Sequence, residues 1–139
     1  MLRSLRKARS LFLAQHRQLL ANAVHERTIG AHFMEALQQC YSSYDVDPDY
    51  NRNLEVPKEA SYLGKTRHIY PDIVVHRRQS HARNHLAIEI KPAGAKPSEV
   101  MKDREKLKAL RKAPYFYAHT YLMRYSTGDN SAIWFEEIT

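Results

Sequence analysis

IYPDIVVHRRQSHARNHLAIEIK, residues 69–91, predicts two neighbouring β-strands joined by a short loop. The first strand, residues 69–76, is apolar and β-branched after Pro71, which is typical of a strand buried on both faces. Residues 85–91 alternate between aliphatic and other side chains, the period-two pattern of a second strand. The polar residues 77–84 between them predict the loop of a hairpin.

Helices and further strands are predicted on both sides of this pair. Their expected positions, in chain order, are helices at 1–20 and about 23–43, an extended stretch at 46–50, a helix at 98–112 with Ser98 as its N-cap, and strands at 115–125 and 131–137. Residues 53–68, which contain Pro57 and Gly64, are expected to form an irregular loop. This order of elements predicts an α/β or α+β sandwich with a mixed sheet.

The length and composition of the chain fit a single domain, residues 1–139. Residues 1–22 are expected to form a basic N-terminal helix; their composition also resembles a mitochondrial presequence, but a helix that belongs to the domain explains it more economically. No run reaches the roughly 20 apolar residues of a membrane helix. We therefore expect a cytoplasmic protein without a membrane partner. Cys40 is the single cysteine, which excludes a disulfide framework and a thiolate zinc site.

Basic side chains outnumber acidic ones, with 22 Lys and Arg against 15 Asp and Glu and a net charge of +7. The excess is concentrated in residues 1–17, 65–83 and 96–112, whereas residues 45–59 are mainly acidic. Clustered basic stretches fit a polyanionic partner such as nucleic acid. Solvated helix faces would explain the same clusters, so charge alone favours nucleic acid only modestly.

Glu89 and Lys91 are the most informative chemical groups in the sequence. They lie two residues apart on one predicted strand and point away from its aliphatic face. Either this face is exposed and the two charges are an ordinary surface pair, or the charges are buried and need a partner or a metal. Asp72 begins the neighbouring strand and reaches the same edge if the strands pair; alternatively it only caps the turn after Pro71. Two carboxylates beside a lysine suit Mg²⁺ or Mn²⁺.

Pro71-Asp72, a sixteen-residue spacer and Glu89-Ile90-Lys91 together resemble the signature of the PD-(D/E)XK nuclease superfamily. The stretches HERTIGAHF, DYNRN and DREKLKAL also resemble landmarks of small bacterial members of unassigned function. The resemblance covers the chain beyond its first two dozen residues. It implies an α/β fold with a restriction-endonuclease-like core, in which a mixed β-sheet is flanked by helices and the motif lies on adjacent strands. It also implies metal-dependent hydrolysis of phosphodiester bonds in nucleic acid, for which we expect DNA.

The resemblance further implies a role for each motif residue. Asp72 and Glu89 would hold one or two Mg²⁺ or Mn²⁺ ions, and the backbone carbonyl of Ile90 would be a further ligand. Lys91 would orient the attacking water, lower its pKa or pair with the phosphate, and the sequence leaves these three roles open. Glu26 matches the acidic residue that many resolvase-like members contribute from a helix. Alternatively, Glu26 only complements the dipole of that helix.

Five basic residues are candidates for contacts with phosphates: Arg77, Arg78 and Arg83 in the predicted loop, and Lys102 and Lys106 on the helix that follows. The alternative function is a catalytically inactive module that binds nucleic acid or a protein on the same fold. A homodimer or a partner protein also remains open. A metal-dependent cleavage assay separates the enzyme from the inactive module.

Other metal and nucleophile chemistries have weaker support. His25 and His32 lie seven residues apart on one predicted helix, and His76 and His85 flank the predicted loop, but no HExxH or HxH spacing is present. We therefore do not expect an all-histidine zinc site. Neither a GxSxG elbow nor a GxxxxGK[ST] loop occurs, which argues against a serine hydrolase and against a nucleotide-binding loop.

Overall fold

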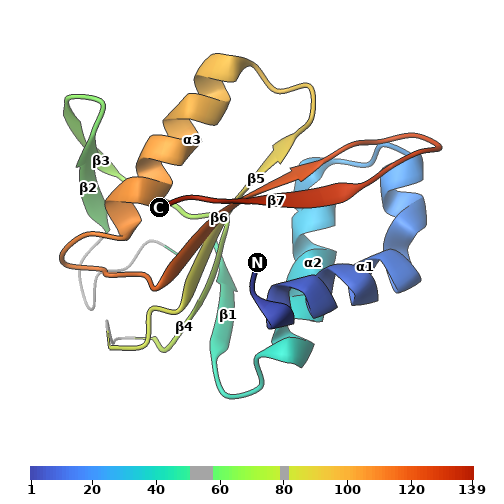
Figure 1. The fold of residues 1–139 in the computed structure, drawn as a ribbon, viewed down its shortest axis with the longest axis horizontal. Helices are drawn as coiled ribbons and strands as arrows, with labels where there is room; N and C mark the ends of the chain where they lie inside the picture. Colours follow the sequence, from blue (N-terminus) through green and yellow to red (C-terminus); the bar gives the residue numbers. More distant parts are fainter. Residues whose placement is uncertain (51–57, 79–81) are drawn as a thin grey trace.

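A five-stranded mixed sheet runs through the centre of the structure, a computed structural model that describes residues 1–50, 58–78 and 82–139 (Figure 1). Across the sheet the strands follow the order β1 (Asp45–Pro48), β4 (Ile73–His76), β5 (Leu86–Pro92), β6 (His119–Tyr125) and β7 (Ile133–Glu137). The β5 and β6 strands are parallel, and the other neighbours are antiparallel. The predicted α/β class and mixed sheet are therefore confirmed.

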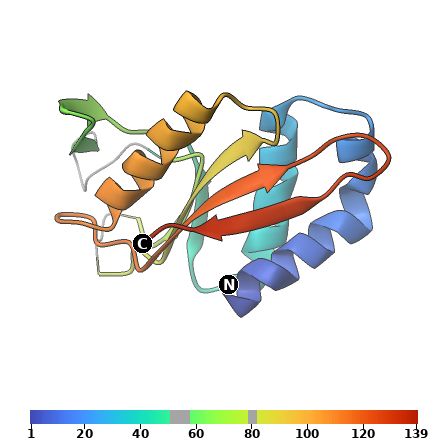
Figure 2. The same cartoon turned by 45° about the horizontal axis from the view of Figure 1, so that its top comes forward.

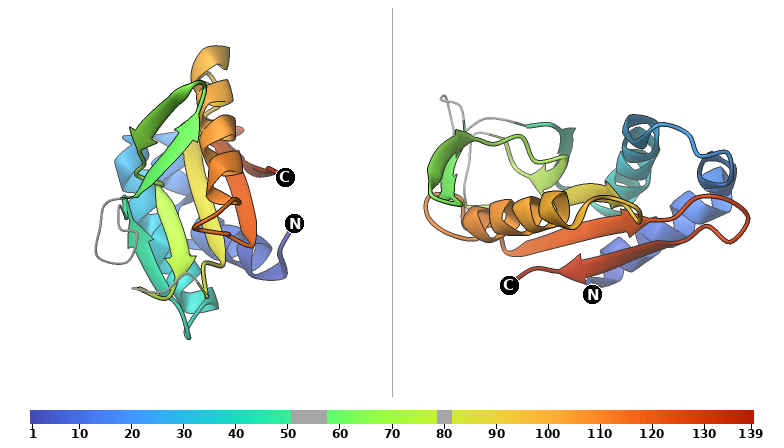
Figure 3. Two further views of the ribbon diagram at one scale, coloured as in Figure 1. Left: turned by 90° about the vertical axis from the view of Figure 1, so that its left-hand side faces the viewer. Right: turned by 90° about the horizontal axis from the view of Figure 1, so that it is seen from above.

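Helices cover both faces of this sheet (Figure 3). The helices α1 (Arg3–Ala21) and α2 (Glu26–Cys40) lie side by side on one face (Figure 2), and α3 (Pro97–Leu110) lies on the other. Each layer has its own apolar cluster: Phe12 and Phe33 pack with Ile88 on the first face, and Leu107 packs with Ala87 on the second. None of these helices is long and apolar enough to cross a membrane, as far as the described residues go.

The predicted pairing of residues 69–91 is confirmed in its essential part. Ile73 lies opposite Ile88 and Val75 opposite Leu86 in an antiparallel register. On β5, the aliphatic side chains face α1 and α2 and the alternate ones face α3, as the period-two pattern predicted. The first strand is shorter than expected, because residues 69–72 precede β4 rather than belong to it.

The expected irregular loop at residues 53–68 is wrong for its described part. The strands β2 (Glu59–Tyr62) and β3 (Lys65–His68) form an antiparallel hairpin, while residues 53–57 lie outside the described residues. Leu63 and Gly64 both have positive φ, 50° and 75°, which suits a two-residue hairpin turn. A leucine at the first turn position hides the hairpin, because Asn or Asp before Gly is the usual signal.

The start of α3 also differs from the prediction. Lys96 is the N-cap, and Pro97 occupies the first turn of the helix. Proline is favoured there because its missing N–H needs no partner and its fixed φ suits a helix. Ser98 therefore lies inside the helix rather than at its cap.

Tyr115 connects the β2–β3 hairpin to the remainder of the molecule. Its hydroxyl donates to the Glu59 carbonyl oxygen at 2.6 Å and accepts from the Glu59 N–H at 2.8 Å. Tyr117 is equally buried, but its hydroxyl has no hydrogen-bond partner among the described residues. Two tyrosines two residues apart thus differ mainly in what their hydroxyl groups contact.

We expect Tyr115→Phe to lower the free energy of unfolding by about 1–2 kcal/mol, because two polar groups of Glu59 lose their partner. Tyr117→Phe is the matched control and should change it by less than about 0.5 kcal/mol, since no hydrogen bond is lost. Equilibrium unfolding in urea measures both values. An equal loss in the two variants would contradict the anchoring role of the Tyr115 hydroxyl.

Candidate active site

Asp72 and Glu89 lie next to each other where β4 begins. Because Ile73 pairs with Ile88, the next position back on this strand brings Asp72 opposite Glu89. Asp72 Oδ2 accepts a hydrogen bond of 2.7 Å from the backbone N–H of Ile90. The carboxylate therefore takes the place of a strand partner at the point where the β4–β5 ladder ends.

The Glu89 side chain is buried, with 2% of its surface exposed. The alternative that this face of β5 is an ordinary solvent-exposed surface is thereby excluded. Glu89 Oε1 lies 2.6 Å from Lys106 Nζ on α3. Burial raises the pKa of Glu89 well above its usual value; Lys106 opposes this shift, while Asp72 and Asp103 add to it.

Lys91 lies on the same face of β5 and is one-quarter exposed. Its Nζ is 3.3 Å from Oδ2 of Asp103, a buried carboxylate on α3. Burial works against the charged form of Lys91, but the nearby carboxylates of Asp103, Glu26 and Asp72 outweigh it and raise the pKa of the lysine. Lys91 is therefore a cation held in place by Asp103.

The α3 helix contributes two residues that the sequence reasoning missed or placed elsewhere. Asp103 was not considered, and Lys106 was expected to contact phosphates from the surface. In the structure the Lys106 side chain is only 15% exposed and contacts Glu89. A signal was available, because Asp103 and Lys106 share the inward stripe of α3 with Leu107.

Glu26 approaches the same cluster from the first turn of α2. Burial raises the pKa of its carboxyl group, and the repulsion of Asp72 acts in the same direction, while Lys91 opposes both. The α2 helix comes close to the sheet at Gly30, where an added Cβ would lie 3.3 Å from the Ile90 side chain. This close approach brings Glu26, one turn earlier, toward Asp72 at the start of β4.

A cleft opens beside this cluster, with a volume of about 790 Å³. Glu26, Asp72 and Ile90 are among its lining residues, together with Arg27 of α2 and Pro48 of β1. It therefore lies between α2 and the strands β1, β4 and β5. Two of the four carboxylates that meet at the site are accessible from this cleft.

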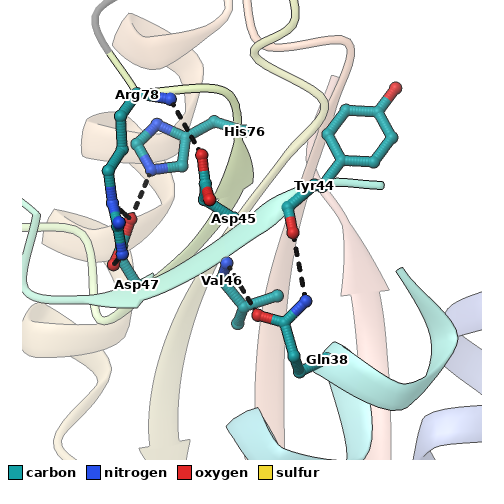
Figure 4. A network of polar contacts seen from close by, with 7 residues as sticks. All are labelled: Gln38, Tyr44, Asp45, Val46, Asp47, His76 and Arg78. Carbon is teal, nitrogen blue, oxygen red and sulfur yellow. Dashed lines mark hydrogen bonds and ion pairs between the residues drawn. The ribbon is translucent and has the colours of Figure 1, made fainter. Parts of the chain in front are cut away.

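The basic residues of the β4–β5 loop lie at the other end of β4 from Asp72. Arg78 is not free for a ligand, because its guanidinium binds Asp47 at 2.9 and 2.6 Å beside His76 (Figure 4). Arg77 follows β4 directly, and Arg83 is exposed on the same loop. The structure does not bring these three arginines to the carboxylate cluster.

Lys102 is exposed on α3, one residue before Asp103. Among the basic residues predicted to contact phosphates, Lys106 contacts the cluster itself, and Lys102 is the next nearest to it in sequence. Arg27, which was not among those candidates, is exposed on α2 and lines the cleft. These two cations lie on helices that cover opposite faces of the sheet.

The donor set of this site fits a hard divalent cation. All four acidic groups offer oxygen, the ligand atom that Mg²⁺ and Mn²⁺ prefer. Oε1 of Glu89 and Oδ2 of Asp103 are buried, and each lies against a lysine ammonium group. The N–H and C=O of one strand residue point to the same side, so the Ile90 carbonyl points toward Asp72 as its N–H does.

No family model, curated protein or solved structure matches the chain. The PD-(D/E)XK resemblance therefore remains a prediction from the sequence, and the function must be inferred from the geometry of the chain itself.

Proposed function

We propose that this chain is a divalent-metal-dependent nuclease with a PD-(D/E)XK, restriction-endonuclease-like core. One observation carries the proposal: four carboxylates from four separate segments meet around two lysines at one end of β5. These are Glu26 of α2, Asp72 before β4, Glu89 of β5 and Asp103 of α3. Asp72 directly precedes β4, Glu89 and Lys91 lie on the adjacent strand β5, and helices cover both sides of the sheet; this arrangement is close to the one that the resemblance implies.

The electrostatics of the cluster support a bound cation. Burial raises the pKa of Glu26, Glu89 and Asp103, and Asp72 adds to the shift of each. Carboxylates held together in this way are costly unless positive charge compensates them. Clusters of groups with shifted pKa values beside a cleft are characteristic of catalytic sites.

The residues divide into ligands and positioning groups. Asp72, Glu89, Glu26 and the Ile90 carbonyl would hold Mg²⁺ or Mn²⁺, which when bound supplies an activated water and stabilises charge on the phosphate. Lys91 faces this position and would orient the water or the scissile phosphate. Asp103 holds the Lys91 ammonium, and Lys106 balances the charge of Glu89.

The net charge of +7 supports a polyanionic substrate, and we propose DNA. Lys102 and Arg27 are exposed on either side of the carboxylates and are the cations best placed to contact its backbone. A catalytically inactive binding module would keep this charge pattern without needing the buried acids. The meeting of carboxylates from four segments favours the enzyme.

Purified protein should cleave DNA with Mg²⁺ or Mn²⁺ and lose this activity in a chelator. Asp72→Asn, Glu89→Gln and Lys91→Ala should each slow cleavage by about a hundredfold or more, as expected when a group that stabilises the transition state is removed. Cleavage of a labelled duplex and of a single strand in single-turnover assays measures the rates.

Matched controls come from the exposed side of α3, where Lys108 pairs with Glu105 at 3.0 Å. Glu105→Gln and Lys108→Ala likewise remove one carboxylate and one ammonium group, but at a position outside the cluster. Both variants should therefore keep the wild-type rate. Circular dichroism establishes that every variant is folded. Full cleavage by Glu89→Gln would refute the assignment, and binding of DNA without any cleavage would support the inactive module instead.

Glu26→Gln tests whether this residue belongs to the metal site. As a ligand, its loss should raise the Mg²⁺ concentration for half-maximal activity by about tenfold or more, with little change in melting temperature. A residue that only complements the helix dipole would instead contribute some tenths of a kcal/mol to stability.

Glu99→Gln is the control for this experiment, because Glu99 is an exposed acid in the first turn of α3. Like Glu26, it lies in the first turn of its helix, but its side chain is exposed to solvent. Activity is titrated against Mg²⁺ for both variants. Superimposable curves for Glu26→Gln and the wild type would remove Glu26 from the site while leaving the proposal for Asp72 and Glu89 intact.

A further inference from the structure

Two histidines interrupt the apolar interface between α1 and α2. On α1, the buried residues Leu5, Ala8, Phe12 and Leu20 recur at three-, four- and eight-residue steps, and His16 occupies the missing position of this stripe. On α2, His32 neighbours the buried Phe33 in the same interface. Each helix therefore directs one imidazole toward the other where an aliphatic side chain would be expected.

The two imidazoles meet, and a carboxylate lies beside them. The ring centroids of His16 and His32 are 4.3 Å apart with an interplanar angle of 36°. His32 Nδ1 lies 3.4 Å from Glu35 Oε2, one turn further along α2. One potential ligand atom from each residue lies within 4.8 Å of the other two. The α1 backbone departs from helical dihedral angles at His16, with φ −134° and ψ 20°.

We propose that His16, His32 and Glu35 bind one divalent transition-metal ion of the Zn²⁺ type. Two imidazoles and one carboxylate suit Zn²⁺, which takes nitrogen and oxygen ligands in a tetrahedron. Mg²⁺ is unsuitable, because it prefers oxygen ligands only. The fourth position would hold water, since His32 is one-third exposed and Glu35 is mostly exposed.

The spacing of the ligand atoms supports such an ion. Bonds of about 2.0–2.1 Å in a tetrahedral site put neighbouring ligand atoms roughly 3.3 Å apart. The His32–Glu35 pair already has this spacing, at 3.4 Å. His16 needs to approach by at most about 1.5 Å, which a rotation of its side chain provides.

This site is separate from the carboxylate cluster. Glu26 and Glu35 are nine residues apart on α2, which corresponds to about 13 Å along the helix axis. The ion would join α1 to α2 rather than take part in hydrolysis. The proposal therefore does not rest on the proposed nuclease function, and either can fail without the other.

The test uses the full chain after treatment with a chelator and dialysis. Titration with Co²⁺ should give the intense visible absorption of a four-coordinate site. The absorption should saturate at one equivalent of Co²⁺ and disappear when Zn²⁺ displaces the Co²⁺. Zn²⁺ in about hundredfold excess over its Kd should raise the melting temperature by roughly 5–10 °C. Mg²⁺ at the same concentration should not displace the bound Co²⁺, so the absorption should remain.

Three variants and two controls decide the result. His16→Gln and His32→Gln should abolish the Co²⁺ absorption, and Glu35→Gln should weaken Zn²⁺ binding by about tenfold or more. His25→Gln, outside this cluster, and Asp72→Asn, in the carboxylate cluster, should retain it. Unchanged Zn²⁺ affinity in folded His16→Gln, or a wild-type Kd weaker than about 1 mM with no stoichiometric end point, would overturn the proposal.

Discussion

The buried carboxylate of Glu89 is the constraint on which the arrangement of the other elements depends. A charge with 2% exposure needs compensation, and Lys106 of α3 supplies it at 2.6 Å. This requirement fixes α3 over β5 in one register, which in turn brings Asp103 to Lys91. Apolar residues at these positions would pack without a desolvation cost, and such replacements are often neutral or stabilising. Stability alone therefore does not explain the presence of these charges.

A second constraint is the short length of β4, which leaves the second half of β5 without a strand partner on that side. The regular ladder begins at Ile73, and Asp72 satisfies the next free N–H of β5 with its side chain. The far half of β5 thus has β6 on one side and the cleft on the other. Gly30 favours the approach of α2 to that half, because an added Cβ would lie only 3.3 Å from the Ile90 side chain. An open strand edge beside a close helix leaves the cleft between α2 and β4.

The strand pair at residues 69–91 was predictable because its period-two pattern and Pro71 act locally. The same pattern indicated that Asp72 and Glu89 could meet, since the strands are neighbours in sequence. Asp103 was missed although it shares the apolar stripe of α3 with Leu107, because a charged residue on such a stripe is usually taken to face solvent. The β2–β3 hairpin was missed for a related reason: Leu63 adopts a positive φ that its residue type does not suggest. Predictions failed where a distant contact, and not the local sequence, determines the conformation.

The α2 helix contributes residues both to the carboxylate cluster and to the His16–His32–Glu35 cluster. Its first turn presents Glu26 to a cluster of hard oxygen donors, and its second and third turns carry His32 and Glu35. Between them, Gly30 is the point of close contact with β5. Any force that holds α1 against α2 therefore acts on the helix that also positions Glu26. Oxygen ligands at one end and imidazoles at the other select different cations. An ion at the histidines could thus stabilise the wall of the cleft without competing for the carboxylates.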